Sequence, residues 1–263
     1  MTEVLIIYLV AGSVVGVLSG IFGIGGGMVV VPTMLFTMPL IGMEGDHQAH
    51  LAIGTSHATI IFTAMASART YHKKGDVDWK IFSNIAPGLI IGSFIFGAFI
   101  SSMFSSDILK KMFAIFSVIM AIKIFMSAHK EHKEAIHHRV TLLGVGLVIG
   151  SISALIGVGG SSMTVPFLSW KALDIRKAVG TAAACGSLIA IFSTSGYIYS
   201  GLSDNSLPEY SLGYIFLPAF IGIILTSTIF VKFGAKLAYK IPPAWQKRSF
   251  GVFLLMVAAK MWF

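Results

Sequence analysis

The chain has 263 residues, of which 56% are hydrophobic and 11% are charged. Soluble globular domains carry about a quarter charged residues, so this composition excludes a soluble domain and indicates an integral membrane protein. Alternating ten-residue strands are absent from the sequence, which excludes an outer-membrane barrel. The net charge of +8 is spread over separate short loops, a pattern that predicts membrane topology and no nucleic-acid partner. The single cysteine, Cys185, excludes an internal disulfide and a cysteine-ligated metal.

Apolar runs divide the chain into ten predicted segments. These are Val4–Phe22, Met28–Met38, Leu51–Tyr71, Ile81–Phe104, Ile108–Ser127, Val140–Ile156, Ser161–Ala172, Ala178–Tyr199, Leu212–Val231 and Trp245–Phe263. Most reach the roughly 20 residues that cross a hydrocarbon core of about 30 Å, but the second and seventh are too short. The sequence therefore predicts an all-α polytopic membrane protein of about ten transmembrane or partly spanning helices.

The basic residues predict the orientation of these segments. Fifteen of the nineteen lysine and arginine residues fall on the loops after segments three, five, seven and nine. Basic loops stay in the cytoplasm, so both termini are expected outside it, in a multi-pass arrangement.

Glycine-rich motifs recur in the two halves of the chain. Gly23–Gly27 runs into Val31-Pro32, and Gly157–Ser161 runs into Val165-Pro166, at a constant offset of 134 residues. Further matched sites are Gly54-Thr55 with Gly180-Thr181 and Tyr71 with Tyr197 at offset 126, and Gly97-Ala98 with Gly234-Ala235 at offset 137. Because five segments per half is an odd number, the second half must enter the membrane inverted. We expect a first repeat at 1–128, a cytoplasmic linker at 129–139 and a second, inverted repeat at 140–263.

Two stripes of small residues predict close helix packing. Gly12 and Gly16 stand four residues apart, as do Gly146 and Gly150. Small residues at this spacing let helix backbones approach closely in lipid, so these stripes are expected to join helices rather than to bind a ligand.

The two glycine-rich loops predict an anion site. A turn at membrane depth frees backbone N–H groups at the start of a short helix, whose dipole favours negative charge. The expected donors are backbone N–H groups of the loops, supplemented by nearby hydroxyls. The predicted substrate-binding residues are Gly23, Gly25, Gly26, Gly27, Gly157, Gly159, Gly160, Ser161, Thr55, Ser56 and Thr181. A packed kink without a ligand, and hydroxyls that merely cap helices, are the alternatives. Pro32 and Pro166 are candidate hinges.

His57 is a candidate for proton coupling, because an ionisable residue in a membrane segment is a functional hypothesis by default. A neutral histidine that is hydrogen-bonded between helices is the alternative. His129, His132, His137 and His138 cluster with Glu131 and Glu134, but this short, charged run is expected to be solvated rather than to bind metal. The sequence has no nucleophile–base motif and no P-loop, so neither a catalytic residue nor a cofactor is expected.

The paired Gly-x-Gly-Gly-Gly/Ser motifs with Val-Pro, the Gly-Thr pairs and the loop Gly75–Trp79 together resemble the sulfite exporter TauE/SafE family, over essentially the whole chain. The resemblance implies a carrier of two inverted halves in a bacterial or archaeal inner membrane. It also implies outward transport of sulfur-containing anions such as sulfite or organosulfonates, coupled to protons.

We therefore expect a secondary transporter that exports a small sulfur-containing anion by alternating access. The expected partners are this anion, protons as coupling ion and the lipid bilayer; an oligomer is compatible with the sequence. One alternative is an uptake carrier for a carboxylate or sulfate. Another is a non-transporting membrane subunit.

Overall fold

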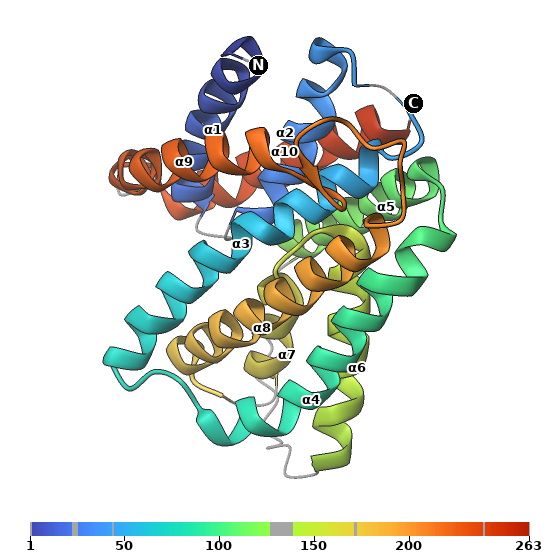
Figure 1. The fold of residues 1–263 in the computed structure, drawn as a ribbon. Coiled ribbons are helices and arrows are strands. Elements are labelled where there is room, and N and C mark those ends of the chain that lie inside the picture. The colour runs from blue at the N-terminus through green and yellow to red at the C-terminus, as the bar shows by residue number, and fades with distance from the viewer. Residues whose placement is uncertain are drawn as a thin grey trace.

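The computed structural model describes residues 2–22, 26–43, 45–126, 139–170, 173–238 and 240–262, which form ten α-helices and one short hairpin. The helices of the first half are α1 (Thr2–Phe22), α2 (Gly27–Thr37), α3 (Gln48–Lys73), α4 (Trp79–Ile95) and α5 (Ser106–Phe125). Those of the second half are α6 (Arg139–Ile156), α7 (Ser161–Trp170), α8 (Ile175–Gly201), α9 (Leu217–Ala238) and α10 (Pro243–Trp262). Both termini lie in the upper part of Figure 1, whereas the turn between α3 and α4 lies at its lower left.

Six described helices are long and apolar enough to cross a membrane: α1, α3, α6, α8, α9 up to Gly234, and α4 with its extension to Met103. The 20-residue helices α5 and α10 carry more charged side chains. Helices α2 and α7 have 11 and 10 residues. At 1.5 Å per residue they extend about 17 and 15 Å, about half of a hydrocarbon core. The chain is thus a multi-pass, all-α membrane protein.

Local sequence signals explain several helix starts. Asp78 caps α4, because its carboxylate accepts hydrogen bonds from the N–H groups of Lys80 and Ile81 at 3.1 and 3.0 Å. Asp174 caps α8 in the same way through Arg176 N–H. At its other end, α4 widens into a π-helical turn, η2 (Phe96–Ile100), and then a 3₁₀ turn, η3 (Ser101–Met103).

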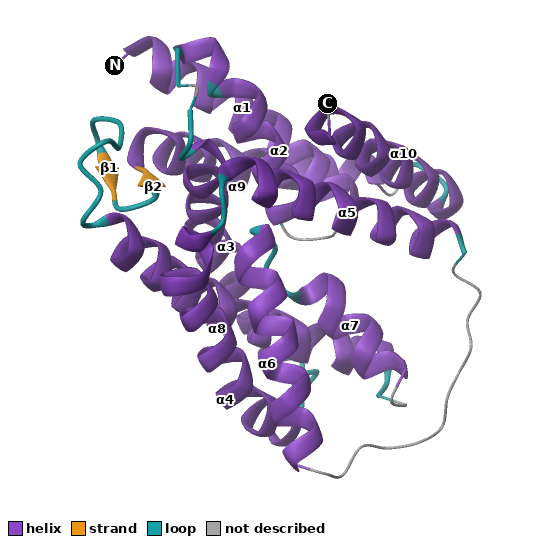
Figure 2. Ribbon diagram, turned by 90° about the vertical axis from the view of Figure 1, so that its right-hand side faces the viewer, coloured by secondary structure: helices purple, strands orange, loops and turns teal. Residues whose placement is uncertain are grey.

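The start of the ninth predicted segment is wrong. Leu212 was expected to begin a helix, but it lies in strand β1 (Ser211–Leu212), which pairs antiparallel with β2 (Ile215–Phe216). Gly213 and Tyr210 adopt left-handed φ angles of 53° and 64°, which turn the chain before α9 can begin. Figure 2 shows the hairpin at one end of the molecule, beside the loops that flank it.

The helices of the two halves pack in matched pairs. Helix α1 lies against α9, and α6 lies against α4; α3 contacts α8, and α5 contacts α10. The small-residue stripes lie in the first two of these contacts, as predicted. A Cβ on Gly16 would come within 2.8 Å of the Ser227 backbone, and one on Gly150 within 2.6 Å of Leu89 O. These glycines therefore join helices of opposite halves.

Candidate functional site between the glycine-rich loops

The described end of the first glycine-rich loop contacts the second loop through Gly27 and Gly157. Residues 23–25, including the predicted donors Gly23 and Gly25, lie outside the described residues. Gly26 is the N-cap residue of α2 and has no side-chain cap, and Gly27 begins the helix. A Cβ on Gly27 would lie 2.8 Å from Gly157 O and 3.2 Å from the Cα of Val158. Only glycine permits this backbone contact between the halves.

The second loop has a backbone that glycine alone adopts readily. Gly157 and Gly160 have φ angles of +79° and +69°. Gly157 N–H donates to Ser153 O at 3.0 Å, which ends α6. Gly160 O accepts from both the N–H and the hydroxyl of Thr164, at 2.8 and 2.9 Å, and so anchors the first turn of α7. This turn leaves Gly159 and Ser161 beside a cavity.

A cavity of about 340 Å³ opens between these loops and helices α3, α7 and α8. Its lining residues are Gly27, Ile60, Thr63, Ala64, Ser67, Gly159, Ser161, Ser162, Val165, Pro166, Val179, Ala182, Ala183 and Gly186. This lining includes four hydroxyl side chains and no charged side chain. A ligand here would meet hydroxyl groups of both α3 and α7 among mostly apolar side chains.

Two features of α7 favour an acceptor-bearing ligand. The hydroxyl of Ser162 is buried and has no hydrogen-bond partner, although buried polar groups are normally paired. Ser161 and Ser162 form the first turn of α7, where backbone N–H groups lack intrahelical partners and the helix dipole is positive. The cavity therefore presents unpaired donors that suit an oxyanion.

Of the predicted site residues that are described, Gly27, Gly159 and Ser161 line this cavity, together with the candidate hinge Pro166. Pro32, the other candidate hinge, lies buried inside α2. Gly26, Gly157 and Gly160 belong to the two loops but do not line the cavity.

Thr55 and Thr181 instead make reciprocal contacts between the halves. Thr55 Oγ1 accepts a hydrogen bond from Phe216 N–H at 3.0 Å, in strand β2 of the hairpin directly before α9. Thr181 Oγ1 accepts from Asp78 N–H at 2.9 Å, in the loop before α4. The preceding glycines, Gly54 and Gly180, touch the same loops so closely that a Cβ would collide with backbone. Each Gly-Thr pair therefore holds a loop of the opposite half.

Ser56 and His57 on α3 contact the second glycine-rich loop and the end of α6 that precedes it. Ser56 Oγ donates to Gly157 O at 2.8 Å, which fixes the loop to α3. His57 is fully buried, and its Nε2 lies 3.3 Å from Ala154 O. Tyr197 Oη donates to the same carbonyl at 3.1 Å. Because a carbonyl oxygen only accepts, His57 Nε2 carries the proton, and its buried Nδ1 is left without a partner.

The cavity includes three hydroxyls that sequence analysis missed: Thr63 and Ser67 on α3 and Ser162 on α7. Thr63 and Ser67 lie three and seven residues after Ile60, a spacing that places all three on one helix face. This spacing was the available signal, but it is also typical of ordinary helix packing.

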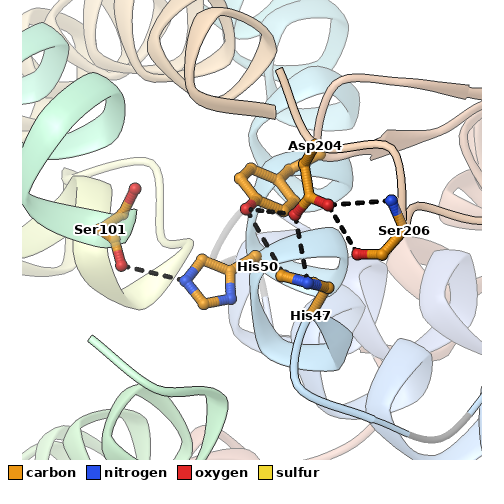
Figure 3. Close-up of polar contacts among 6 residues, drawn as sticks. His47, His50, Ser101, Asp204 and Ser206 are labelled. Atoms are coloured by element: carbon orange, nitrogen blue, oxygen red, sulfur yellow. Dashed lines mark hydrogen bonds and ion pairs between the residues drawn. The ribbon is translucent and has the colours of Figure 1, made fainter. Parts of the chain in front are cut away.

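A second polar cluster lies at the start of α3, far along the helix from Ser67. His47 Nε2 lies 3.1 Å from Asp204 Oδ2, and Tyr214 Oη donates to the same oxygen at 3.2 Å. Two hydrogen bonds from Ser206 reach Asp204 Oδ1, and His50 Nε2 lies 3.0 Å from Ser101 O (Figure 3). The cluster joins α3 to the loop between α8 and α9 and to η3.

The histidine-rich run at 129–138 lies outside the described residues, so the expectation about metal binding there stays a prediction. Within the ranges that the structure describes, no group of three or more His, Cys, Asp or Glu side chains is arranged to hold a metal ion.

Membrane-crossing helices, paired half-length helices and a small uncharged cavity that carries a few hydroxyl groups are typical of a membrane transporter. Comparison with known proteins identifies its family. The model of the family "Sulfite exporter TauE/SafE" matches residues 8–261, and the chain belongs to this family. No solved structure matches the chain.

Two relatives illustrate the extent of the similarity. A protein of Haemophilus influenzae named "Probable membrane transporter protein" is 37% identical over 259 residues, which cover 98% of this chain and 97% of the relative. A protein of Methanocaldococcus jannaschii with the same description is 27% identical over 239 residues, covering 89% and 86%. These proteins are named as transporters, and the chain is likewise a membrane transporter and not an enzyme.

Proposed function

We propose that the chain is a secondary transporter that exports a small sulfur-containing anion, sulfite or an organosulfonate, by alternating access. The observation that carries this proposal is the uncharged cavity with unpaired donors at the meeting point of two glycine-rich loops. The family to which the chain belongs supports the substrate class.

The anion would bind at the amino end of α7. Its oxygens would accept hydrogen bonds from Ser161, Ser162 and the first backbone N–H groups of this helix. Ser67 would donate from α3, where Thr63 Oγ1 already donates to Ile60 O at 3.2 Å, and Gly27 would keep the opposite loop close. Neutral donors suit a carrier, because a buried cation would bind the anion strongly and delay its release.

The helix pairings support two inverted repeats, 1–128 and 140–263, that are joined by the linker 129–139. Helix α1 contacts α9 just as its counterpart α6 contacts α4, and each Gly-Thr pair holds a loop of the other half. A two-fold relation between the halves produces such reciprocal contacts. With the basic loops in the cytoplasm, both termini would lie outside, in a bacterial or archaeal inner membrane.

Protons are the proposed coupling ion, and His57 is the proposed coupling residue. His57 Nε2 lies 3.3 Å from Ala154 O, near the end of α6, where the second glycine-rich loop begins. Its unpaired Nδ1 is available as an acceptor when the surrounding helices move.

The test is uptake of radiolabelled sulfite into proteoliposomes, with and without a pH gradient. The informative variant is Ser161→Ala with Ser162→Ala, and the matched control is Ser169→Ala, on the same helix but outside the cavity lining. Saturable flux with a raised KM in the double variant alone would support the site. Native protein that transports neither sulfite nor small organosulfonates would refute the proposed substrate class. Flux that does not saturate would indicate a channel.

A further inference from the structure

Repeat-related helices differ sharply in burial. Helices α2 and α7 correspond at the offset of 134 residues. In α2, the residues Gly27–Pro32, Met34 and Leu35 are buried, whereas in α7 the buried residues are Thr164 and Leu168. The cavity accounts for part of this difference, because Ser161, Ser162, Val165 and Pro166 of α7 line it and no residue of α2 after Gly27 does.

The long helices α3 and α8 repeat the same contrast at the offset of 126 residues. Thr63, Ala64 and Ser67 on the second half of α3 are partly exposed and line the cavity. Their counterparts on the second half of α8 are Ile189, Ala190 and Ser193, and each is 0% exposed. Two-fold related halves would give two equivalent cavities, but one of them is closed.

The closed region contains polar atoms that packing alone does not explain. Ser193 Oγ and His57 Nδ1 are fully buried and have no hydrogen-bond partner. Ser193 corresponds to Ser67, and His57 corresponds to Ala183; both counterparts line the open cavity. Buried unpaired polar groups are costly, and opening of this region to water or a ligand would supply Ser193 and His57 with partners.

The π-helical turn η2 covers this closed region. A Cβ on Gly97 would lie 3.1 Å from Ser193 O, and one on Gly196 would lie 2.8 Å from Ala98 N, so η2 and α8 are in backbone contact. Gly234, the counterpart of Gly97, instead packs on Val17 and Gly20 of α1. The end of α4 has thus closed onto α8, whereas the equivalent part of α9 packs on α1. π-Helical turns often mark functional positions in helices.

We propose that a second access path, lined by His57 and Ser193 and closed by η2, reaches the anion site from the opposite side of the membrane. This inference rests on the proposed transport function and names its second access route. Opening requires η2 to leave α8 and His50 to release Ser101 O, the bond of 3.0 Å that holds η3 to α3. As η2 leaves α8 and this path opens, α9 would close over the cavity beside Ser67.

The experiment measures access with cysteines and does not depend on any substrate. In a Cys185→Ala background, Ser193→Cys and its matched control Ser67→Cys are reconstituted and treated with a membrane-impermeant, negatively charged thiosulfonate reagent. The reagent is applied to one side of the membrane at a time. Cys185 is the single cysteine of the sequence, so each variant then carries only the introduced thiol. We expect the two introduced cysteines to react from opposite sides, with the cysteine at 193 reacting more slowly.

A third variant, Gly196→Ala in the Ser193→Cys protein, tests the cover directly. Its new methyl group would lie 2.8 Å from Ala98 N of η2, and this overpacking predicts roughly tenfold faster labelling at 193. Labelling at 193 from the same side as at 67, or from neither side even with Gly196→Ala, would overturn the second path. Opposite-side labelling in a protein that transports no tested anion would retain the path and refute only the proposed substrate.

Discussion

His47 and Asp204 join two parts of the chain that are 157 residues apart. Nε2 of His47, beside the start of α3, lies 3.1 Å from Oδ2 of Asp204, in the loop between α8 and α9. The pair lies in the cluster that also holds Tyr214, whose hydroxyl donates to the same carboxylate oxygen. The contact therefore links the α3 end nearest to η3 with the second half of the chain, on the side that we propose to be closed.

The first prediction concerns the pH dependence of this contact. Hydrogen bonds from the Ser206 hydroxyl and N–H, together with the charge of His47 and the hydroxyl of Tyr214, lower the pKa of the Asp204 carboxyl below its ordinary value of 3.8, although partial burial opposes the shift. A lowered native pKa contributes stability above the unfolded pKa, and this stability is lost as pH falls through the native pKa.

Asp204→Asn should therefore lower the free energy of unfolding at neutral pH by about 1 kcal/mol, a size typical of a half-exposed ion pair. The difference from the native protein should vanish as the pH falls below 3.8. Thermal unfolding in detergent across this range measures it. Glu209→Gln, in the same loop and without a resolved contact to His47, is the control. Equal stability of native and Asp204→Asn proteins at pH 7 would contradict the prediction.

The second prediction compares adjacent glycines at the loop contact. A methyl group at Gly27 would meet Gly157 O at 2.8 Å and Ile60 Cδ1 at 2.7 Å, whereas one at Gly26 would meet only Val30 and Ser19 at 3.5 Å or more. Gly27→Ala should thus lower the free energy of unfolding by about 1–3 kcal/mol and reduce transport, because it separates the loops. Gly26→Ala should behave like the native protein in both assays. Similar effects of the two substitutions would show that the close approach is not what requires glycine.

The third prediction concerns the reciprocal threonines. Thr55→Val and Thr181→Val each leave a backbone N–H of the opposite half without its acceptor, which costs about 1–3 kcal/mol when that group is buried. The bond to Phe216 is buried and the bond to Asp78 is only part-buried, so Thr55→Val should be the more destabilising. Thr→Ser at either position keeps the hydroxyl and should retain most of the stability. Thermal unfolding of the four variants measures these differences in stability. A larger loss of stability in Thr181→Val than in Thr55→Val would contradict this order.

Much of the fold was predictable because its signals are local. The start of α7 at Ser161 follows a glycine turn and agrees with the predicted segment, whereas α8 begins at Ile175, after the cap residue Asp174 and before the predicted start at Ala178. The hairpin at 211–216 was missed because hydrophobicity alone does not distinguish a short apolar strand from the start of a helix. The left-handed φ of Tyr210, a residue that rarely adopts it, leaves no signal in the sequence.

The candidate site was predictable only where the repeat marks it. The duplicated loops identified Gly27, Gly159 and Ser161, which the structure brings to one cavity. Thr63 and Ser67 carry no motif, and their importance comes from their position opposite α7. The difference in burial between α2 and α7 could not be predicted. We propose that it belongs to one of two conformations, and a repeat in the sequence does not indicate which conformation is adopted.

The last prediction concerns His57. Its Nε2 and the Tyr197 hydroxyl both donate to Ala154 O, so the carbonyl keeps one donor when the other is removed. His57→Gln retains an amide donor of similar reach but has no ring nitrogen that can gain a proton. If His57 carries the coupling proton, this variant should lose the stimulation of sulfite flux by a pH gradient. It should still exchange labelled for unlabelled substrate across the membrane, because exchange needs the binding site but not the proton.

The control is Tyr197→Phe, which removes the other donor to the same carbonyl and should retain the stimulation. Gradient-driven flux that persists at the native level in His57→Gln would assign His57 a structural role between α3 and α6, and loss of exchange in both variants would point to the shared carbonyl rather than to the proton.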